Sequence, residues 1–383
     1  MNIIYVSSLI PPRIFDEIFS EAHGNYVIAP NKFHHTIVAG FISGNHRVKS
    51  ISVLPNNYPH LDKIEEEGIE YYFCKHSDIK GLKQLQVSYE VIHIIRKIIA
   101  EGFFPDVIIC DILNVSLCLG AIFASKYFKI KNAAIVTDIL GISEHEEKNL
   151  LHRLASRVSN SYITTFDNYI LLTEQMNSVV NPHHKPYIIM EAICSDSKNI
   201  KIPKPSNNLK KLFYAGGRPE KDGIELLIKA FKRIEDDNLQ LNIFGPLPNV
   251  EIGEDLEDRR IIYHGTVDNN AVLTEEVSSY LLINPRPTGE TYTHYSFPSK
   301  IMEYMSSGVP MVTTRLAGIP NEYYEYVFTF DNCNVESYYR KLKEILSMPK
   351  ETLLTKGLNA KKFVLNNKNQ SIQTNRIIEL IKN

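Results

Sequence analysis

Short apolar segments alternate with helical ones along most of the chain, and this alternation restricts the fold more than any other feature. The clearest case lies between residues 105 and 137, where PDVIIC is followed by a helical pattern over 115–127 and then by AAIVT. A strand without polar alternation is buried on both faces, as in parallel sheets. Strands joined by helices at this spacing form βαβ units. We therefore predict an α/β fold with parallel sheets, whose ligands bind outside the carboxyl ends of the strands.

The same patterns predict the remaining elements. Segment 85–100 is the strongest helix, because its apolar residues recur on one face; they are Val87, Val91, Ile94, Ile95 and Ile98. Pro11 and Pro12 should keep the loop after the first strand from becoming helix at once. The predicted strands are 2–8, 50–54, 70–74, 105–110, 133–137, 168–172, 187–190, 212–215, 240–244, 261–264, 280–283, 309–314 and 326–330. The predicted helices are 31–41, 85–100, 115–127, 149–161, 224–234, 298–307, 335–348, 351–365 and 371–381.

Length and charge limit the possible classes of function. A chain of 383 residues exceeds one ordinary core and predicts two domains. Its formal net charge of −2 gives no overall attraction to nucleic acid or anionic lipid. Five cysteines without a CxxC pair are typical of reduced thiols in the cytoplasm. We read no signal peptide, and the most apolar stretch, 112–124, is shorter than the roughly 20 residues of a spanning helix.

A shift in composition predicts the domain boundary at 196–211. DSKNIKIPKPSNNLKK is rich in Lys, Asn and Ser, contains two prolines and has few large apolar residues, as in linkers. We predict a first domain over 1–195, a linker over 196–211, a second domain over 212–365 and a terminal helical segment over 366–383.

The most informative stretch is 284–314, NPRPTGETYTHYSFPSKIMEYMSSGVPMVTT. Pro298 suits the first turn of a helix, and Gly308 with Pro310 stops it. A helix start offers free N–H groups and about half a positive charge, which suits a phosphate. Glu303, about one turn further on, is placed to accept hydrogen bonds from sugar hydroxyls. The alternative is an exposed helix carboxylate.

A second loop after the strand 212–215 has the residue types of a diphosphate site. Gly216 and Gly217 let backbone approach a ligand closely, and Arg218 and Lys221 can reach its phosphates. A GxGxxG fingerprint is absent, which disfavours a dehydrogenase. The chain also contains no Asp-x-Asp pair, so we expect no metal. The alternative is a glycine turn with solvated charges.

The stretch 284–314 resembles the donor-binding motif of retaining GT-B glycosyltransferases of the family-4 type. Glu303, Gly308 and Pro310 match its second half, whereas Tyr295 occupies the position of its first Glu. The form FPSKxxEYMxSGxP looks like a subgroup of bacterial polysaccharide glycosyltransferases. The resemblance implies two Rossmann-like domains that face each other across a cleft, with a C-terminal helix that crosses back to the first domain.

The resemblance also implies roles for particular residues. The donor should be bound in the second domain by Gly216, Gly217, Val267 (at the nucleotide base), Glu303 and the segment Tyr295, Ser296, Phe297, Pro298 and Ser299. Tyr292 and His294 should lie over the sugar with Tyr295. Arg218 and Lys221 should stabilise the leaving diphosphate. In the first domain, Asp138 ends the IVTD run and should orient the reacting sugar.

Three other features receive ordinary structural interpretations. His34 and His35 are predicted to be surface histidines, because neighbouring helical positions point about 100° apart and do not share a metal easily. His183 and His184 are predicted to be exposed. Asp111, at a strand end, is predicted to be an N-cap or turn former, with a site role as the alternative.

Taken together, these features predict a hexosyltransferase that needs no metal. We expect it to move a sugar from a nucleotide sugar, most plausibly a UDP-sugar, to a saccharide or lipid-linked saccharide in surface-polysaccharide assembly. It should be cytoplasmic, with peripheral contact at the inner face of the membrane as an option, and should not bind nucleic acid. Its oligomeric state is not predicted. A non-catalytic GT-B partner subunit and an isomerase of the UDP-sugar 2-epimerase kind remain alternatives.

Overall fold

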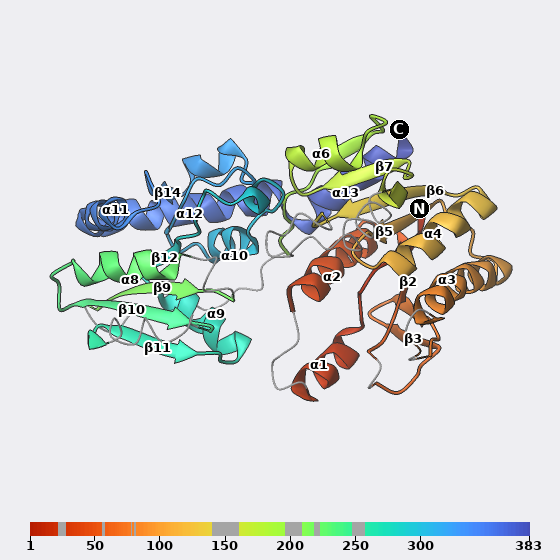
Figure 1. Ribbon diagram of the computed structural model, residues 1–383, viewed down its shortest axis with the longest axis horizontal. Coiled ribbons are helices and arrows are strands. Elements are labelled where there is room, and N and C mark those ends of the chain that lie inside the picture. The colour runs from red at the N-terminus through yellow and green to blue at the C-terminus, as the bar shows by residue number, and fades with distance from the viewer. Residues whose placement is uncertain are drawn as a thin grey trace. The chain divides into compact units, whose positions relative to one another are not determined.

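The computed structural model describes residues 1–21, 28–55, 58–77, 79, 82–139, 161–195, 209–217, 223–246 and 257–383 (Figure 1). Contacts divide the chain into two compact units. The first comprises Met1–Ser195 together with Asn369–Asn383, and the second comprises Asp196–Lys368. The helix predicted at 149–161 and most of the predicted linker lie outside the described residues.

The first unit is built on an eight-stranded sheet in the order β3-β4-β2-β1-β5-β6-β7-β8. All neighbouring strands are parallel except β3 and β4. The strands are β1 Asn2–Val6, β2 Arg47–Ser52, β3 Lys63–Glu66, β4 Ile69–Phe73, β5 Val107–Asp111, β6 Lys131–Val136, β7 Asn168–Leu171 and β8 Tyr187–Ile189. The helices are α1 Pro12–Glu21, α2 Ile28–Ser43, α3 Leu82–Ala100, α4 Val115–Phe128, α6 Glu174–Val180 and α13 Gln370–Lys382.

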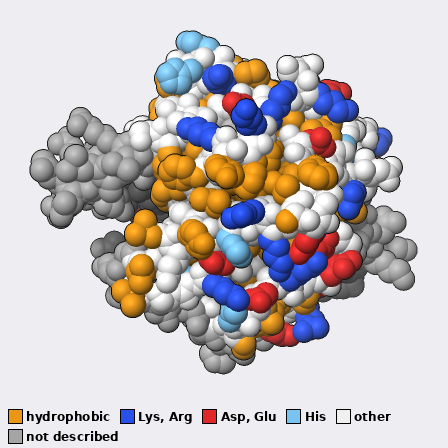
Figure 2. All heavy atoms as spheres, turned by 90° about the vertical axis from the view of Figure 1, so that its right-hand side faces the viewer, with side chains coloured by type: hydrophobic (Ala, Val, Ile, Leu, Met, Phe, Trp, Pro, Cys, Tyr) orange, Lys and Arg blue, Asp and Glu red, His pale blue; other side chains and the backbone are white. Residues whose placement is uncertain are grey.

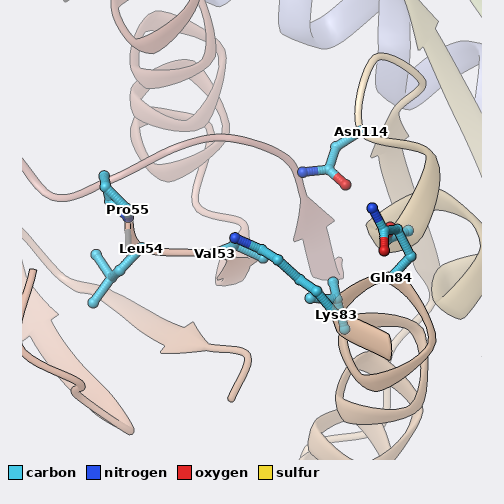
Figure 3. Close-up of a pocket in the computed structure, with 8 residues that line it drawn as sticks. Val53, Leu54, Pro55, Lys83, Gln84 and Asn114 are labelled. Carbon is cyan, nitrogen blue, oxygen red and sulfur yellow. The ribbon is translucent and has the colours of Figure 1, made fainter. Parts of the chain in front are cut away.

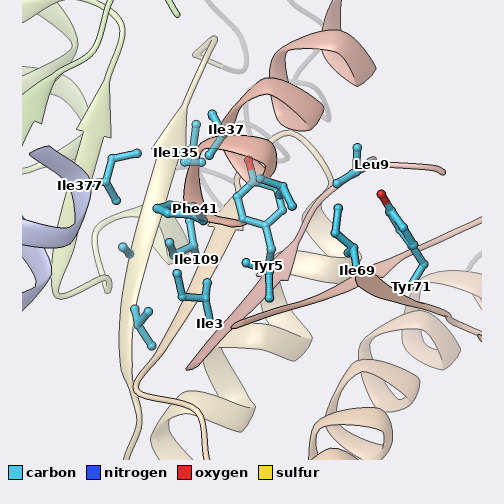
Figure 4. Packing of buried hydrophobic residues seen from close by; sticks show 14 of the residues in the cluster. Ile3, Tyr5, Leu9, Ile37, Phe41, Ile69, Tyr71, Ile109, Ile135 and Ile377 are labelled. Atoms are coloured by element: carbon cyan, nitrogen blue, oxygen red, sulfur yellow. The ribbon is translucent and has the colours of Figure 1, made fainter. Parts of the chain in front are cut away.

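Helices cover both faces of this sheet. The crossover from β1 to β2 runs in the opposite direction along the sheet from those through α3 and α4, so right-handed connections place α2 on one face and α3 with α4 on the other. The core under α2 includes Ile3 and Tyr5 of β1, Ile109 of β5, and Ile37 and Phe41 of α2 itself, all fully buried (Figure 4).

The chain end completes this core. Ile377, Ile378 and Ile381 of α13 belong to the same cluster. Gly40 of α2 allows the close approach, because a Cβ there would lie 2.8 Å from the carbonyl oxygen of Gln370. The Gln373 side-chain amide donates to the Ala192 carbonyl at 2.8 Å. The last helix is therefore part of the first unit.

The second unit has a six-stranded, all-parallel sheet in the order β11-β10-β9-β12-β13-β14. Its strands are β9 Lys210–Ala215, β10 Leu239–Phe244, β11 Ile261–Gly265, β12 Leu281–Asn284, β13 Met311–Thr313 and β14 Phe328–Thr329. Its helices are α8 Ile224–Lys232, α9 Asn269–Ser278, α10 Ser299–Ser307, α11 Val335–Ser347 and α12 Lys350–Asn367, with 3-10 turns η3 Thr291–His294 and η4 Asn321–Glu325. Strand β9 begins two residues earlier than predicted.

Most predicted elements agree with the structure within a few residues, and the buried stripe of α3 is the predicted one. One expectation was wrong: α1 begins at Pro12, because proline has a suitable φ for the first helical position and needs no N–H there. Strand β3 and helices α6 and α9 were missed. β3 is an exposed edge strand, KIEE, without an apolar run, and α9 has no clear amphipathic pattern. None of the described helices is long and apolar enough to cross a membrane.

Candidate active site

Glycines close the carboxyl ends of three neighbouring strands in the second unit. Gly245, after β10, has φ +99°, and a Cβ there would lie 1.8 Å from the carbonyl oxygen of Gly216 after β9. The Gly216 N–H donates to the Phe244 carbonyl at 3.1 Å, and the Gly245 N–H donates to the Gly265 carbonyl at 2.8 Å. Backbone alone therefore forms this part of the sheet edge, which a phosphate group can approach closely. We call Gly216, Gly245 and Gly265 the glycine edge.

Sequence reasoning found only part of this edge. Gly217 was expected, and space around it is open, with nothing within 4 Å of a Cβ built there. Gly245 was missed as a site residue, although a strand followed by Gly-Pro is a signal that could have found it. Arg218 and Lys221, the expected diphosphate ligands, lie outside the described residues.

Helix α10 is held against the glycine edge by its tyrosine. The Ala215 N–H, at the end of β9, donates to the Tyr304 hydroxyl at 3.2 Å. Tyr304 is fully buried, and burial, followed by the charges of Glu276 and Glu303, raises its pKa well above the ordinary value. The neutral hydroxyl therefore persists at neutral pH. This contact packs α10, the helix that carries Glu303, against the end of β9, where the glycine edge begins.

Glu303 lies at the surface of α10 and has a charged neighbour. Lys300 Nζ lies 3.0 Å from Glu303 Oε1, and the Glu303 side chain is 24% exposed. Lys300 also lies over the Tyr304 ring at 5.8 Å. The carboxylate is thus accessible. It lies about one turn after the first residue of α10, as predicted from the sequence.

The start of α10 differs slightly from the prediction. Pro298 is the N-cap residue rather than part of the first turn, and Ser299 is the first helical residue. The helix ends as predicted, with Gly308 in the left-handed conformation at φ 83°. Phe297 is buried and packs on Tyr323, with ring centroids 5.3 Å apart. Phe297 is therefore a core anchor for the loop.

A second close backbone contact fixes the loop before α10. A Cβ on Gly318 would lie 2.1 Å from the carbonyl oxygen of Ser296 and 2.7 Å from that of Thr293. Tyr295 and Ser296 are half-buried, whereas His294 is exposed. The predicted segment 295–299 therefore precedes and begins α10 as a rigid loop.

Arg286 is a cation of this edge that sequence reasoning missed. It follows β12 and lies over the Tyr292 ring, 5.5 Å from the ring centroid. Its backbone carbonyl accepts a hydrogen bond from the Thr314 hydroxyl, and the preceding carbonyl of Pro285 accepts one from Tyr338 at 2.7 Å. Gly223, the N-cap of α8, packs against the same Pro285 carbonyl, since a Cβ there would lie 2.4 Å from its oxygen. The signal that could have found Arg286 is its place directly after a buried strand.

Val267, the residue predicted to bind the base, lies in the loop between β11 and α9. Its side chain is 38% exposed, and Asp268 begins α9 by accepting a hydrogen bond from the Asn270 N–H at 2.8 Å. Nearby, His264 stacks on Phe244, with centroids 4.2 Å apart, and bonds to Asn242 Oδ1 at 2.8 Å. Burial lowers the pKa of His264. This neutral aromatic pair lies at the ends of β10 and β11, next to the glycine edge.

In the first unit, two aspartates follow neighbouring strands. Asp138, two residues after β6, is exposed, and its Oδ1 accepts the Ile139 N–H at 2.8 Å. Asp111, at the end of β5, is buried, and its Oδ1 accepts the Leu113 N–H at 3.2 Å. The turn-forming interpretation of Asp111 is confirmed by this bond.

The prediction that His34 is a surface residue was wrong. His34 is 1% exposed, because it lies one turn before Ile37 on the inner face of α2. Its Nε2 lies 3.2 Å from Asp111 Oδ2, and its Nδ1 lies 2.7 Å from the Tyr5 hydroxyl. His35 is half-buried and pairs with Glu67 at 3.2 Å. Paired polar atoms thus compensate the burial of the His34 ring.

A cavity of about 400 Å³ opens at the carboxyl edge of the first sheet (Figure 3). Its polar wall is formed by Lys83 and Gln84 at the start of α3 and by Asn114 and Ser116 at the start of α4. Val53, Leu54 and Pro55, after β2, form the opposite apolar wall. Figure 3 shows the Lys83 side chain extending across toward Val53. Within the described ranges, no group of three or more His, Cys, Asp or Glu side chains could hold a metal ion.

Comparisons with known proteins agree with this architecture. Residues 210–348 match the family model described as glycosyl transferases group 1. No curated protein matches the sequence. Solved structures resemble the whole chain, and three of them serve as examples. They are sucrose-phosphate synthase from Thermosynechococcus elongatus (13% identity, TM-score 0.66, covering 100% of this chain and 98% of that one), HepE from Anabaena in complex with UDP and glucose (13%, 0.62, 100% and 99%), and the catalytic domain of starch synthase IV from Arabidopsis thaliana bound to ADP and acarbose (12%, 0.69, 100% and 99%). The chain therefore has the GT-B fold, and its family match supports a GT-B glycosyltransferase.

Proposed function

We propose that the protein transfers a sugar, with retention, from a nucleotide sugar to a saccharide or lipid-linked saccharide acceptor. The expected donor is a UDP-sugar, and no metal takes part. The enzyme is of the family-4 type and acts in surface-polysaccharide assembly. The observation that carries the proposal is the packing of α10, which carries Glu303, at the glycine-lined end of β9, through the bond between Ala215 and Tyr304. HepE and starch synthase IV, which share this fold, are complexes with UDP and ADP.

Each part of this edge matches one part of a nucleoside diphosphate. The glycine edge leaves room for the phosphates, because it carries no side chains, although the Gly216 and Gly245 N–H groups already donate within the sheet. The first N–H groups of α10 offer donors. Glu303 suits a pair of ribose hydroxyls, because an ionised carboxylate only accepts hydrogen bonds. The backbone of Val267 suits the base. Arg218, Lys221 and the newly found Arg286 provide positive charge near the phosphates.

The chemistry requires stabilisation of the departing diphosphate. Negative charge grows on the β-phosphate as the glycosidic bond breaks, and loss of one prearranged donor costs about 3 kcal/mol in comparable sites. The residues supply such donors without an Asp-x-Asp motif. The departing phosphate oxygen itself takes the acceptor proton, so no protein base is needed. Asp138 of the first unit, an exposed carboxylate at a strand end, orients the sugar.

The decisive experiment measures donor binding and turnover separately. The melting temperature of the full chain is recorded with UDP, ADP and a panel of their sugars, because a ligand of the native state raises it with concentration. Release of UDP is then measured with saccharide and lipid-linked acceptors, with and without EDTA. A UDP-sugar should stabilise the chain and be consumed only when acceptor is present, regardless of EDTA.

Other outcomes point to the other functions. Donor binding without any turnover favours a non-catalytic partner subunit, for which Tyr295 in the position of the first Glu of the motif is the motivating feature. Conversion of the donor alone, seen by NMR, favours an isomerase. Loss of turnover with EDTA and recovery with manganese contradicts the metal-independent mechanism. No stabilisation by any nucleotide contradicts the proposed donor site.

A further inference from the structure

The outer face of helices α3 and α4 exposes large apolar side chains that the proposed transfer reaction does not use. On α3, Leu82, Leu85 and Tyr89 are 42%, 70% and 65% exposed. On α4, Phe123 and Tyr127 are 60% and 77% exposed. Both sets recur at helical spacing, three, four or seven residues apart, so each forms one stripe. We call these five residues the apolar face. Exposed apolar groups of this size usually mark an interaction surface.

The two helices form one rigid platform. A Cβ on Gly120 of α4 would lie 2.5 Å from the carbonyl oxygen of Ser88 on α3, so the helices approach closely at this glycine. The Ser88 hydroxyl donates to the Ser116 carbonyl at 2.8 Å, which ties their N-terminal halves together. The apolar face is therefore held in place by packing and is not a flexible segment that could fold away.

Basic residues outnumber acidic ones on the two helices that carry the apolar face. Segments 82–101 and 113–129 contain five basic residues and two acidic ones, Glu90 and Glu101, a difference of +3 on a chain whose formal net charge is −2. The basic residues are Lys83, Arg96, Lys97, Lys126 and Lys129. All of them except Lys83 are exposed. Figure 2 views this end of the first unit, where hydrophobic side chains gather across the middle and Lys, Arg, Asp and Glu side chains lie around them.

We propose that the apolar face docks on an anionic lipid bilayer. Aromatic and leucine side chains enter the boundary between headgroups and acyl chains, while Lys and Arg keep their charges at the headgroups and pair with lipid phosphates. A second copy of the chain is a poorer occupant. A two-fold dimer through this face would place its positive charge against the same positive charge of the partner copy.

The cavity in Figure 3 also lies at the N-terminal end of α3, where Lys83 and Gln84 form part of its polar wall. Consecutive residues of a helix point about 100° apart, so these two side chains lie on other sides of α3 than Leu82 and Leu85, and the cavity is separate from the apolar face. Docking does not rest on the proposed function, whereas a lipid-linked acceptor does.

The test is co-sedimentation of the full chain with vesicles of phosphatidylcholine, with and without phosphatidylglycerol. We expect binding to the anionic vesicles only, weakening with salt. Combining Phe123→Ser with Tyr127→Ser should abolish it. Lys126→Gln and Lys129→Gln should weaken it by about fivefold each, because one basic residue near such a surface contributes about 1 kcal/mol.

A matched control is available on α12 of the second unit. Leu354 and Leu358 are also four residues apart and are 47% and 52% exposed, so Leu354→Ser with Leu358→Ser removes similar apolar surface elsewhere. This control should bind vesicles like the wild type. Unchanged melting temperatures of all variants would show that they fold.

Three results would overturn the proposal: no binding to anionic vesicles, equal loss in the α12 control, or a dimer in solution that dissociates with Phe123→Ser and Tyr127→Ser. The measurement needs neither donor nor acceptor. If the wild type binds UDP but not anionic vesicles, docking alone is refuted, whereas a wild type that binds vesicles but no UDP refutes the proposed function alone.

Discussion

Replacement of Glu303 by alanine is the most direct test of the donor site. The carboxylate is 24% exposed and pairs with the half-buried Lys300 at 3.0 Å, and such a pair near the surface contributes little to folding. If it accepts a hydrogen bond from ribose, each such bond to a charged group contributes about 1.5–3 kcal/mol. The dissociation constant for UDP should therefore rise by about 10- to 150-fold.

Isothermal titration calorimetry with UDP measures this change, and a melting curve without nucleotide checks the fold. Glu303→Gln keeps one acceptor oxygen and should fall between the wild type and Glu303→Ala. Lys300→Gln is the control for the ion pair, because it removes the partner and keeps the carboxylate. Equal affinity of the wild type and Glu303→Ala for UDP would refute the ribose assignment. A large fall in melting temperature would instead show that Glu303 is structural.

Three further predictions concern the rest of the molecule. Asp138→Ala should leave UDP affinity unchanged and abolish transfer. Weaker UDP binding in calorimetry would contradict the proposed role of Asp138 in orienting the sugar. Gly245→Ala should lower both the melting temperature and UDP affinity, because its Cβ would lie 1.8 Å from the Gly216 carbonyl oxygen. The control Gly102→Ala, also at positive φ but in open space, should cost only the local backbone strain of about 1–2 kcal/mol. Similar losses of stability in the two variants would argue against a crowded glycine edge. Burial opposes ionisation of Glu70, but hydrogen bonds from Lys63, Lys49 and Tyr72 outweigh it and lower the pKa of Glu70 from 4.5 to about 2. The ionised carboxylate therefore stabilises the fold above pH 4.5, and this contribution is lost as the pH falls toward 2. In denaturation curves, the stability of Glu70→Gln should depend less on pH in this window, and the same pH dependence as in the wild type would contradict the pairing.

The elements themselves could be read from local sequence where the signal was local. The apolar run PDVIIC and the helical stripe of α3 specify a buried strand and a packed helix through their own side-chain pattern. The N-terminal proline and C-terminal glycine around α10 act through backbone conformation and are equally visible in sequence. Strand β3 could not be predicted this way, because its KIEE sequence forms a strand only by pairing with β4.

The candidate site was predicted only in part, because it too depends on contacts between residues that are distant in sequence. Glu303, Gly216 and Gly217 lie in recognisable motifs, whereas Gly245 and Arg286 become candidate site residues only when parallel pairing brings the ends of β9, β10 and β12 together. His34 was misplaced because its helix position does not reveal which groups it meets. Asp111 and Tyr5, which make its burial tolerable, are 77 and 29 residues away in sequence.

The sequence by itself determined the α/β class, most strand and helix positions and the motif that suggests a nucleotide sugar, because each depends on side-chain periodicity or backbone conformation within a few residues. The tertiary structure decided which strand ends adjoin, which glycines touch a neighbouring carbonyl and which helix faces remain exposed. Those properties arise from contacts between residues that are distant in the chain. Both the glycine edge and the apolar face of α3 and α4 belong to this second group.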